Sequence, residues 1–141
     1  MPEAPTSSIP GPVVALAGWL LPGAGYFLIG QRSRGLTVGI TIIALFVLGL
    51  LIGGLRVVEA SNLGYTTATM RAIMDRPWFV GQVLAGPMAL ITANIARGEW
   101  FLHSHARLNE IGTLYTAVAG MLNLMAVVDS AWRASRPGGT R

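Results

Sequence analysis

Long uncharged stretches alternate with short charged segments along this chain. Three of the uncharged stretches contain 21, 20 and 18 residues: Gly35–Leu55, Pro77–Ala96 and Ile111–Val128. A helix needs about 20 predominantly apolar residues to cross roughly 30 Å of hydrocarbon. The pattern therefore predicts membrane-spanning helices at about residues 35–55, 77–96 and 111–131.

A further apolar stretch, at about residues 13–30, is interrupted by Pro22-Gly23-Ala24-Gly25. Proline removes a helical hydrogen bond and glycine loosens the backbone, so we expect a helix to kink or stop at this elbow. One interpretation is a kinked helix that crosses the membrane. The other is a short re-entrant helix that turns back. We favour the kinked span, which gives an all-α integral membrane protein, a small bundle of about four transmembrane helices.

The composition agrees with a membrane location. Hydrophobic residues make up 52% of the chain and charged residues 11%, with a mean hydropathy of +0.58. An average soluble domain carries about 25% charged residues. All ten basic residues are arginines, which give a net charge of +4 with the six acidic residues. They are spread along the chain in ones, twos and threes between the apolar stretches, which is typical of residues at lipid headgroups and favours the lipid bilayer, with no nucleic acid, as partner.

The polar segments define the limits of the predicted domain. Residues 1–12 contain four prolines and are predicted to be a disordered lead, residues 13–132 to form a single transmembrane helical domain, and residues 133–141 to be a disordered tail. In the link that precedes Pro77, the spacing of Met70, Ile73 and Met74 favours a short surface helix. Four spans would place six arginines on the side of both termini and four on the other. This bias favours cytoplasmic termini of a multi-pass protein in the bacterial inner (cell) membrane.

Two predicted spans carry stripes of small or polar residues at helical spacing. The third span has Gly81, Ala85, Ala89 and Ala93, and the fourth has Gly112, Thr116, Gly120 and Asn123. Small residues let helix backbones approach closely in lipid. We predict that these two helices pack on each other. A homo-oligomer interface, or contact with a larger membrane-protein complex, is the alternative role for the stripes.

Few residues are candidates for a binding or catalytic role. Gln82, Asn94 and Asn123 are the polar residues inside predicted spans, and they suit hydrogen bonds between helices. Asp129, at the end of the fourth span and one turn from Arg133, is expected to pair with an arginine at the interface, and the alternative is a role as a proton or cation ligand. His103 and His105 do not have the i, i+4 spacing of helical metal ligands. No metal, cofactor or catalytic set is predicted, and the chain is not expected to be an enzyme.

Two motifs resemble those of known membrane families. Leu21 to Gly30 reads LPGAGYFLIG and is followed by Arg32 and Arg34. This segment resembles the Gly-rich turn that joins two helices in two-transmembrane-domain proteins, with Gly23, Gly25 and Gly30 at the turn. The run NEIGTLYTAVAGMLNL from Asn109, which ends near Asp129, is similar to the C-terminal signature of a bacterial multi-span membrane family with a domain of unknown function. The resemblance implies membrane location and helical architecture, and no biochemical activity.

These features predict a protein that acts through interaction. A chain with packing stripes, short links and no reactive constellation is typical of an accessory, scaffold or assembly subunit. The alternative is a small oligomeric transporter or channel, in which Gln82, Asn94 and Asn123 would line a polar path.

Overall fold

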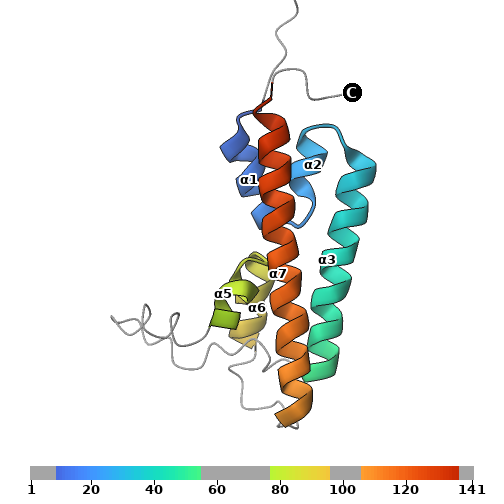
Figure 1. The fold of residues 1–141 in the computed structure, drawn as a ribbon, viewed down its shortest axis with the longest axis vertical. Helices are drawn as coiled ribbons and strands as arrows, with labels where there is room; N and C mark the ends of the chain where they lie inside the picture. The colour runs from blue at the N-terminus through green and yellow to red at the C-terminus, as the bar shows by residue number, and fades with distance from the viewer. Residues whose placement is uncertain (1–8, 55–76, 96–105, 137–141) are drawn as a thin grey trace, which may run out of the picture.

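The computed structural model describes residues 9–54, 77–95 and 106–136. In this part of the chain every regular element is a helix, as predicted (Figure 1). The helices are α1 (Gly11–Leu20), α2 (Ala24–Leu28), α3 (Arg32–Gly53), α5 (Pro77–Val83), α6 (Pro87–Ile95) and α7 (Ala106–Ala134). The predicted surface helix around Met70, the outer part of the lead and the last five residues of the tail lie outside the described residues.

The long helices α3 and α7 lie antiparallel and side by side, and they carry the fold (Figure 1). Both contain a segment that is long and apolar enough to cross a membrane, Arg32–Gly53 and Asn109–Ala134. They pack closely near one end, where a Cβ added at Gly49 would lie 2.9 Å from the carbonyl oxygen of Gly112. Two of the four predicted spans thus correspond to long apolar helices.

The first apolar stretch does not form the kinked span that we expected. Helix α1 ends at Leu20, Leu21 is extended, as is favoured before a proline, and Gly23 has a φ of +87°. The chain then turns back into the short helix α2, which packs against α1 (Figure 1). Since α1 has ten residues, it is about 15 Å long, roughly half of a hydrocarbon core. The chain thus turns back after a short helix, as the second interpretation expects of its backbone.

The third apolar stretch is also broken, although we expected one continuous helix over residues 77–96. Helix α5 ends at Val83, and a turn at residues 84–86 leads into α6. Gly86 has a φ of +84°, and the following Pro87 has no N–H with which to continue a helix. Within the described residues the two pieces have seven and nine residues, each shorter than the roughly 20 residues that a membrane crossing needs. Figure 1 shows them as a second hairpin beside α7.

The two hairpins meet tip to tip near the middle of α7. Gly86, at the tip of the α5–α6 hairpin, lies so close to the end of α1 that a Cβ there would collide with the Trp19 carbonyl oxygen. The α1–α2 hairpin packs against the C-terminal half of α7, with Gly18 beside Val127. The α5–α6 hairpin begins nearer the other end of α7. The two hairpins therefore approach from opposite ends of the bundle.

The interior holds polar as well as apolar side chains, and the outside of the two long helices is rich in large apolar ones. The interior contains polar side chains that are nearly or fully buried, namely Gln82, Thr92, Thr116, Asn123 and Ser130. The outside of α3 and α7 presents large apolar side chains that are between two fifths and three quarters exposed, including Leu36, Ile40, Leu51, Leu114, Met121 and Met125. The buried polar side chains therefore lie between helices and not at the surface of the bundle.

Candidate functional site

A buried polar contact joins α5 to α7. The Gln82 side-chain amide donates a hydrogen bond to the Thr116 hydroxyl oxygen at 2.9 Å, and both residues are fully buried. The single proton of the Thr116 hydroxyl is shared between the carbonyl oxygens of Gly112 and Thr113, at 3.1 and 3.0 Å. The contact links two helices through side chains that have no access to solvent. A polar group without a partner in such a place lowers the stability of the fold.

Asn123 holds the break between α5 and α6. Its Nδ2 atom donates to the carbonyl oxygen of Leu84 at 3.0 Å, in the turn where the helix has stopped. An intact helix would supply a backbone N–H for that carbonyl, and here the α7 side chain supplies the donor instead. The Asn123 Oδ1 atom is buried and has no hydrogen-bond partner among the described residues.

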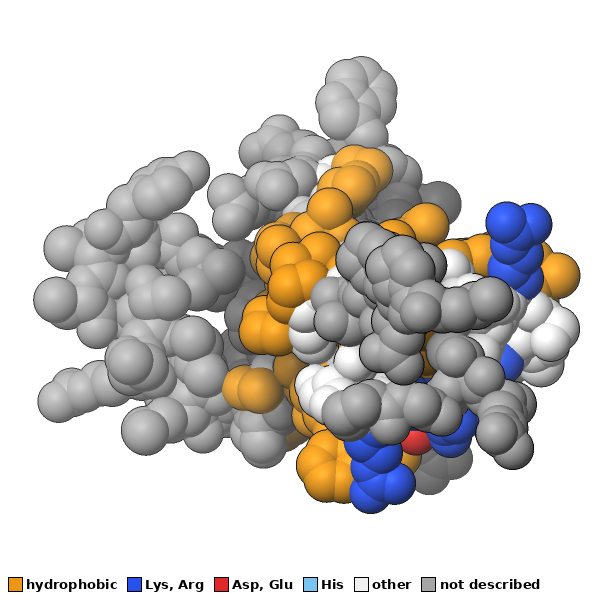
Figure 2. All heavy atoms as spheres, turned by 90° about the horizontal axis from the view of Figure 1, so that it is seen from above, with side chains coloured by type: hydrophobic (Ala, Val, Ile, Leu, Met, Phe, Trp, Pro, Cys, Tyr) orange, Lys and Arg blue, Asp and Glu red, His pale blue; other side chains and the backbone are white. Residues whose placement is uncertain are grey.

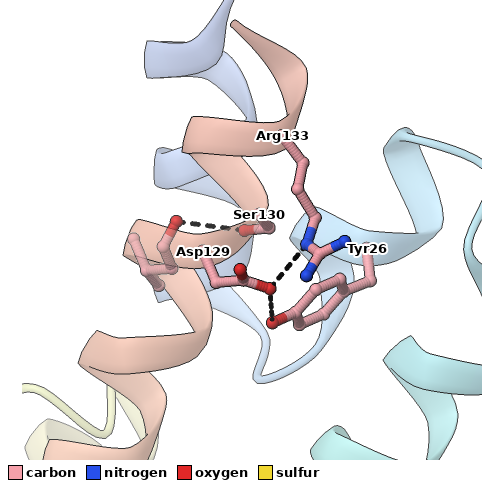
Figure 3. A network of polar contacts seen from close by, with 5 residues as sticks. Tyr26, Asp129, Ser130 and Arg133 are labelled. Atoms are coloured by element: carbon pink, nitrogen blue, oxygen red, sulfur yellow. Dashed lines mark hydrogen bonds and ion pairs between the residues drawn. The ribbon is translucent and has the colours of Figure 1, made fainter. Parts of the chain in front are cut away.

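A second polar cluster lies near the C-terminal end of α7, where α2 approaches it (Figure 3). The Tyr26 hydroxyl and the Arg133 Nε both donate to Asp129 Oδ2, each at 2.8 Å. Arg133 and Asp129 lie four residues apart on α7 with side chains about one third and two fifths exposed. Tyr26 is buried, and its bond to Asp129 ties the short helix α2 to α7. The structure therefore brings together the two charged residues that we expected to pair.

The same end of the bundle carries further arginines. Arg32 and Arg34 lie in the first turn of α3 and are exposed. Arg34 is close enough to Asp129 and Tyr26 to act on them electrostatically. The guanidinium of Arg136 lies 4.6 Å from the centre of the Trp132 ring, which is the geometry of a cation–π contact.

The predicted small residues lie at helix contacts of different closeness. A Cβ added at Gly120 would collide with the Gly81 carbonyl oxygen and lie 3.0 Å from the Ala85 backbone nitrogen, so α5 and α7 approach at these positions. Ala89 is buried in the apolar core. Gly112 packs on α3, not on α5 or α6, because Gly49 and Gly53 of α3 are its close neighbours. The side chains of Ala93 and Asn94 lie outside the described residues.

The glycines of the predicted turn have separate roles. Gly23 packs against Gly35 and Gly39 of α3, and a Cβ at Gly23 would collide with the Gly35 carbonyl oxygen. Gly25 faces the Ser130 hydroxyl across an equally tight contact. Gly30 has a φ of +82° and no atom within 4 Å of an added Cβ, so it serves only the backbone turn.

Comparison with known proteins assigns most of the chain to one family. A family of unknown function, DUF6677, matches residues 13–140. The chain belongs to this family. No curated protein and no solved structure matches it.

The described part of this DUF6677 chain contains no group of three or more His, Asp or Glu residues that could hold a metal ion. His103 and His105 lie outside that part. Two contacts were not predicted from the sequence. One is the hydrogen bond from Tyr26 on α2 to Asp129, and the other is the contact between Gly86 and Trp19 at the hairpin tips. A Gly-Pro pair in mid-span, as at Gly86-Pro87, was the available signal for the broken helix.

Proposed function

We propose that this protein is a small multi-pass protein of the bacterial inner membrane that acts by binding another membrane component, as an accessory, scaffold or assembly subunit. The observation that carries the proposal is the apolar exterior of the two long helices, around an interior that also holds buried polar groups. Gln82, Thr116 and Asn123 are fully buried, while large apolar side chains cover the outside of α3 and α7. An exposed apolar surface of this extent is costly in water and matches the acyl chains of a bilayer.

In the proposed arrangement α3 and α7 cross the membrane, and the two hairpins enter it from opposite sides. Irregular backbone is tolerated at membrane depth where protein covers it. The turn at residues 84–86 is covered by the end of α1 at Trp19 and is hydrogen-bonded by Asn123. Two crossings leave the start of α1 and the end of α7 on one side of the membrane, because Gly11 lies against Ala131 and Ser135.

This arrangement changes the arginine count that the four-span prediction used. The links at residues 55–76 and 96–105 join helix ends at the end of the bundle opposite to Pro10 and Arg136. With two crossings, each side of the membrane receives five of the ten arginines. The positive-inside rule then gives no orientation, because it acts through a difference in arginine and lysine number.

Binding is favoured over catalysis by what the buried polar groups do. Gln82, Thr116 and the amide nitrogen of Asn123 all make hydrogen bonds between or within helices. Asp129 accepts from both Tyr26 and Arg133. These groups are engaged in holding the bundle together, and the outward apolar faces remain for a partner.

Photo-crosslinking in native membranes tests the proposal. A photoreactive amino acid at Leu114, Met121 or Met125, on the outward face of α7, should give discrete adducts with a second copy or another membrane protein. The matched control is Ala119 on the same helix, which is fully buried and should give none. Lipid adducts alone at all three outward positions, together with a monomer that co-purifies with no protein in mild detergent, would overturn the interaction role.

A small oligomeric transporter or channel is the second candidate. Broken helices with a buried polar group at mid-membrane are a common way to build ion and substrate sites, and Asn123 Oδ1 is such a group. The contact between Gly86 and Trp19 argues against an open path within one copy, because it fills the place where the hairpins meet. Ion or solute flux into liposomes that is present with the native chain and lost in Asn123→Leu would favour this candidate. Flux that is absent, or unchanged in Asn123→Leu, would remove it.

A further inference from the structure

At the end of the bundle that carries Arg32 and Arg136, basic side chains lie next to exposed apolar side chains. Figure 2 looks down on this end and shows basic side chains next to exposed apolar ones. The acidic residues among the described positions are Glu110, near the opposite end of α7, and Asp129, which already accepts from Arg133. Arg34 also acts electrostatically on Asp129, whereas Arg32 and Arg136 have no acidic partner in the described part of the chain.

On α3, Arg32 continues an outward apolar stripe. Arg32, Leu36 and Ile40 are spaced by four residues, which places them on one helix face, and all three are exposed. The apolar part of this face extends along the helix toward Val47 and Leu51, which are also exposed. The stripe is therefore long, apolar and capped by a positive charge at one end.

On α7, the same order occurs with the chain direction reversed. Trp132 and Val128 are exposed at a spacing of four residues, with Met125 and Met121 further along the helix. Arg136 follows Trp132 by four residues and stacks on its ring. Because α3 and α7 are antiparallel, both arginines lie at the same end of the bundle.

The position of Arg32 and Arg34 is unfavourable for the helix itself. They lie in the first turn of α3, which contains no acidic residue and whose cap residue Gln31 makes no side-chain hydrogen bond. The N-terminal end of a helix carries partial positive charge and is stabilised by anions, so two arginines there repel it. An anion bound from outside would offset this repulsion.

We propose that this end of the bundle binds the phosphate headgroups of anionic phospholipids, whose acyl chains lie along the two apolar stripes. A ligand that satisfies each stripe has a negative phosphate and long apolar chains, and phospholipid has both. Nucleic acid and inorganic phosphate match the arginines and leave the apolar stripes without a partner. The inference rests on the proposed membrane location and adds the class of lipid and the end of the protein that binds it.

The test uses the full chain, purified in neutral detergent, with thermal unfolding followed while lipid is added. Phosphatidylglycerol should stabilise the native chain at much lower concentration than phosphatidylcholine. The double variant Arg32→Gln/Arg34→Gln should weaken the phosphatidylglycerol effect about tenfold to thirtyfold. The control Arg71→Gln/Arg76→Gln removes the same charge elsewhere in the sequence. This variant should retain the stabilisation by phosphatidylglycerol. Arg32→Lys/Arg34→Lys keeps the charge and should recover most of the binding.

Equal responses to the two lipids, or equal losses in the two glutamine variants, would overturn the inference. So would competition by inorganic phosphate or a short RNA at concentrations that match phosphatidylglycerol. Alkaline carbonate extraction of native membranes is run in parallel. Release of the chain by carbonate would overturn the proposed membrane function, whereas a carbonate-resistant chain without lipid preference would overturn only this inference.

Discussion

The side-chain amide of Asn123 donates a hydrogen bond to the carbonyl oxygen of Leu84, 39 residues earlier in the chain. Leu84 lies in the turn where α5 has ended, so its carbonyl has left the regular helical pattern. One side chain on the long helix α7 thus stabilises the break in a neighbouring apolar segment. This relationship explains why a stretch with the length of a membrane span folds into two short helices.

Asn123→Leu should therefore destabilise the protein. It leaves the Leu84 carbonyl without its donor in a buried environment, and we expect the free energy of unfolding to fall by about 0.6–2 kcal/mol. Unfolding in detergent, followed by circular dichroism, measures the change. Met125→Leu on the exposed face of α7 is the control and should change it by less than about 0.5 kcal/mol. Equal stability of the two variants would show that the bond to Leu84 contributes nothing.

The contact between the hairpin tips predicts a difference between two glycines. Gly86→Ala and Gly30→Ala both place a Cβ at positive φ, which costs about 1–2 kcal/mol. Only at Gly86 does the new Cβ also collide with the Trp19 carbonyl oxygen, whereas the space around Gly30 is open. We expect Gly86→Ala to lower the free energy of unfolding by at least about 1 kcal/mol more than Gly30→Ala. Similar losses in the two variants would contradict the tip contact.

At the α5–α7 contact, adding a methyl group on one helix should destabilise the protein more than adding one on the other. Gly120→Ala introduces a Cβ that collides with the Gly81 carbonyl oxygen, which backbone atoms cannot easily avoid. Gly81→Ala places its Cβ 3.2 Å from the Ala117 Cβ and 3.4 Å from the Ala117 carbonyl oxygen, a tight contact that a small shift relieves. Gly120→Ala should therefore destabilise by about 1–3 kcal/mol and Gly81→Ala by clearly less. The reverse order in thermal unfolding would show that the helices pack in another register.

In the cluster around Asp129, the buried Tyr26 hydroxyl should contribute more to the free energy of unfolding than the partly exposed Arg133 guanidinium. Tyr26→Phe removes a hydrogen bond to a carboxylate from a buried hydroxyl, which should cost about 1–3 kcal/mol. Arg133→Gln removes an ion pair with partly exposed partners, and solvent screening limits its loss to about 0–1 kcal/mol. Added salt should reduce the effect of Arg133→Gln and leave that of Tyr26→Phe almost unchanged. A salt-sensitive Tyr26→Phe would indicate that this end opens in solution.

Cysteine labelling distinguishes two crossings from four. The chain has no cysteine, so single variants Ser33→Cys, Ser135→Cys and Glu110→Cys each carry one thiol. The structure places the first two at one end of the bundle and the third near the other. With two crossings, a membrane-impermeant maleimide should label Ser33→Cys and Ser135→Cys from the same side and Glu110→Cys from the opposite side. Labelling of Ser33→Cys from the side of Glu110→Cys would instead support four crossings.

The sequence was sufficient to predict the helical class, the two long apolar helices and the pairing of Asp129 with an arginine. Charge-free length identified α3 and α7, because a long run without charge or proline leaves the helix as the way to satisfy the backbone in an apolar environment. The position of Asp129 at the end of the fourth span, one turn from Arg133, predicted its pairing with an arginine. The four-residue spacing of Gly81 and Ala85 indicated a close helix contact, which occurs at Gly120. Each of these features depends on residues close together in the chain.

Only the tertiary structure decided how the two interrupted stretches are arranged. Pro22-Gly23 and Gly86-Pro87 permit either a kinked helix or a turn, since both conformations are open to the backbone at these residues. Contacts distant in the sequence select the turn. Gly35 leaves room for the approach of Gly23, and Asn123 supplies the donor that the broken helix lacks. Chain pattern therefore determined which segments are helical and apolar, and packing between distant segments determined which of them run the length of the bundle.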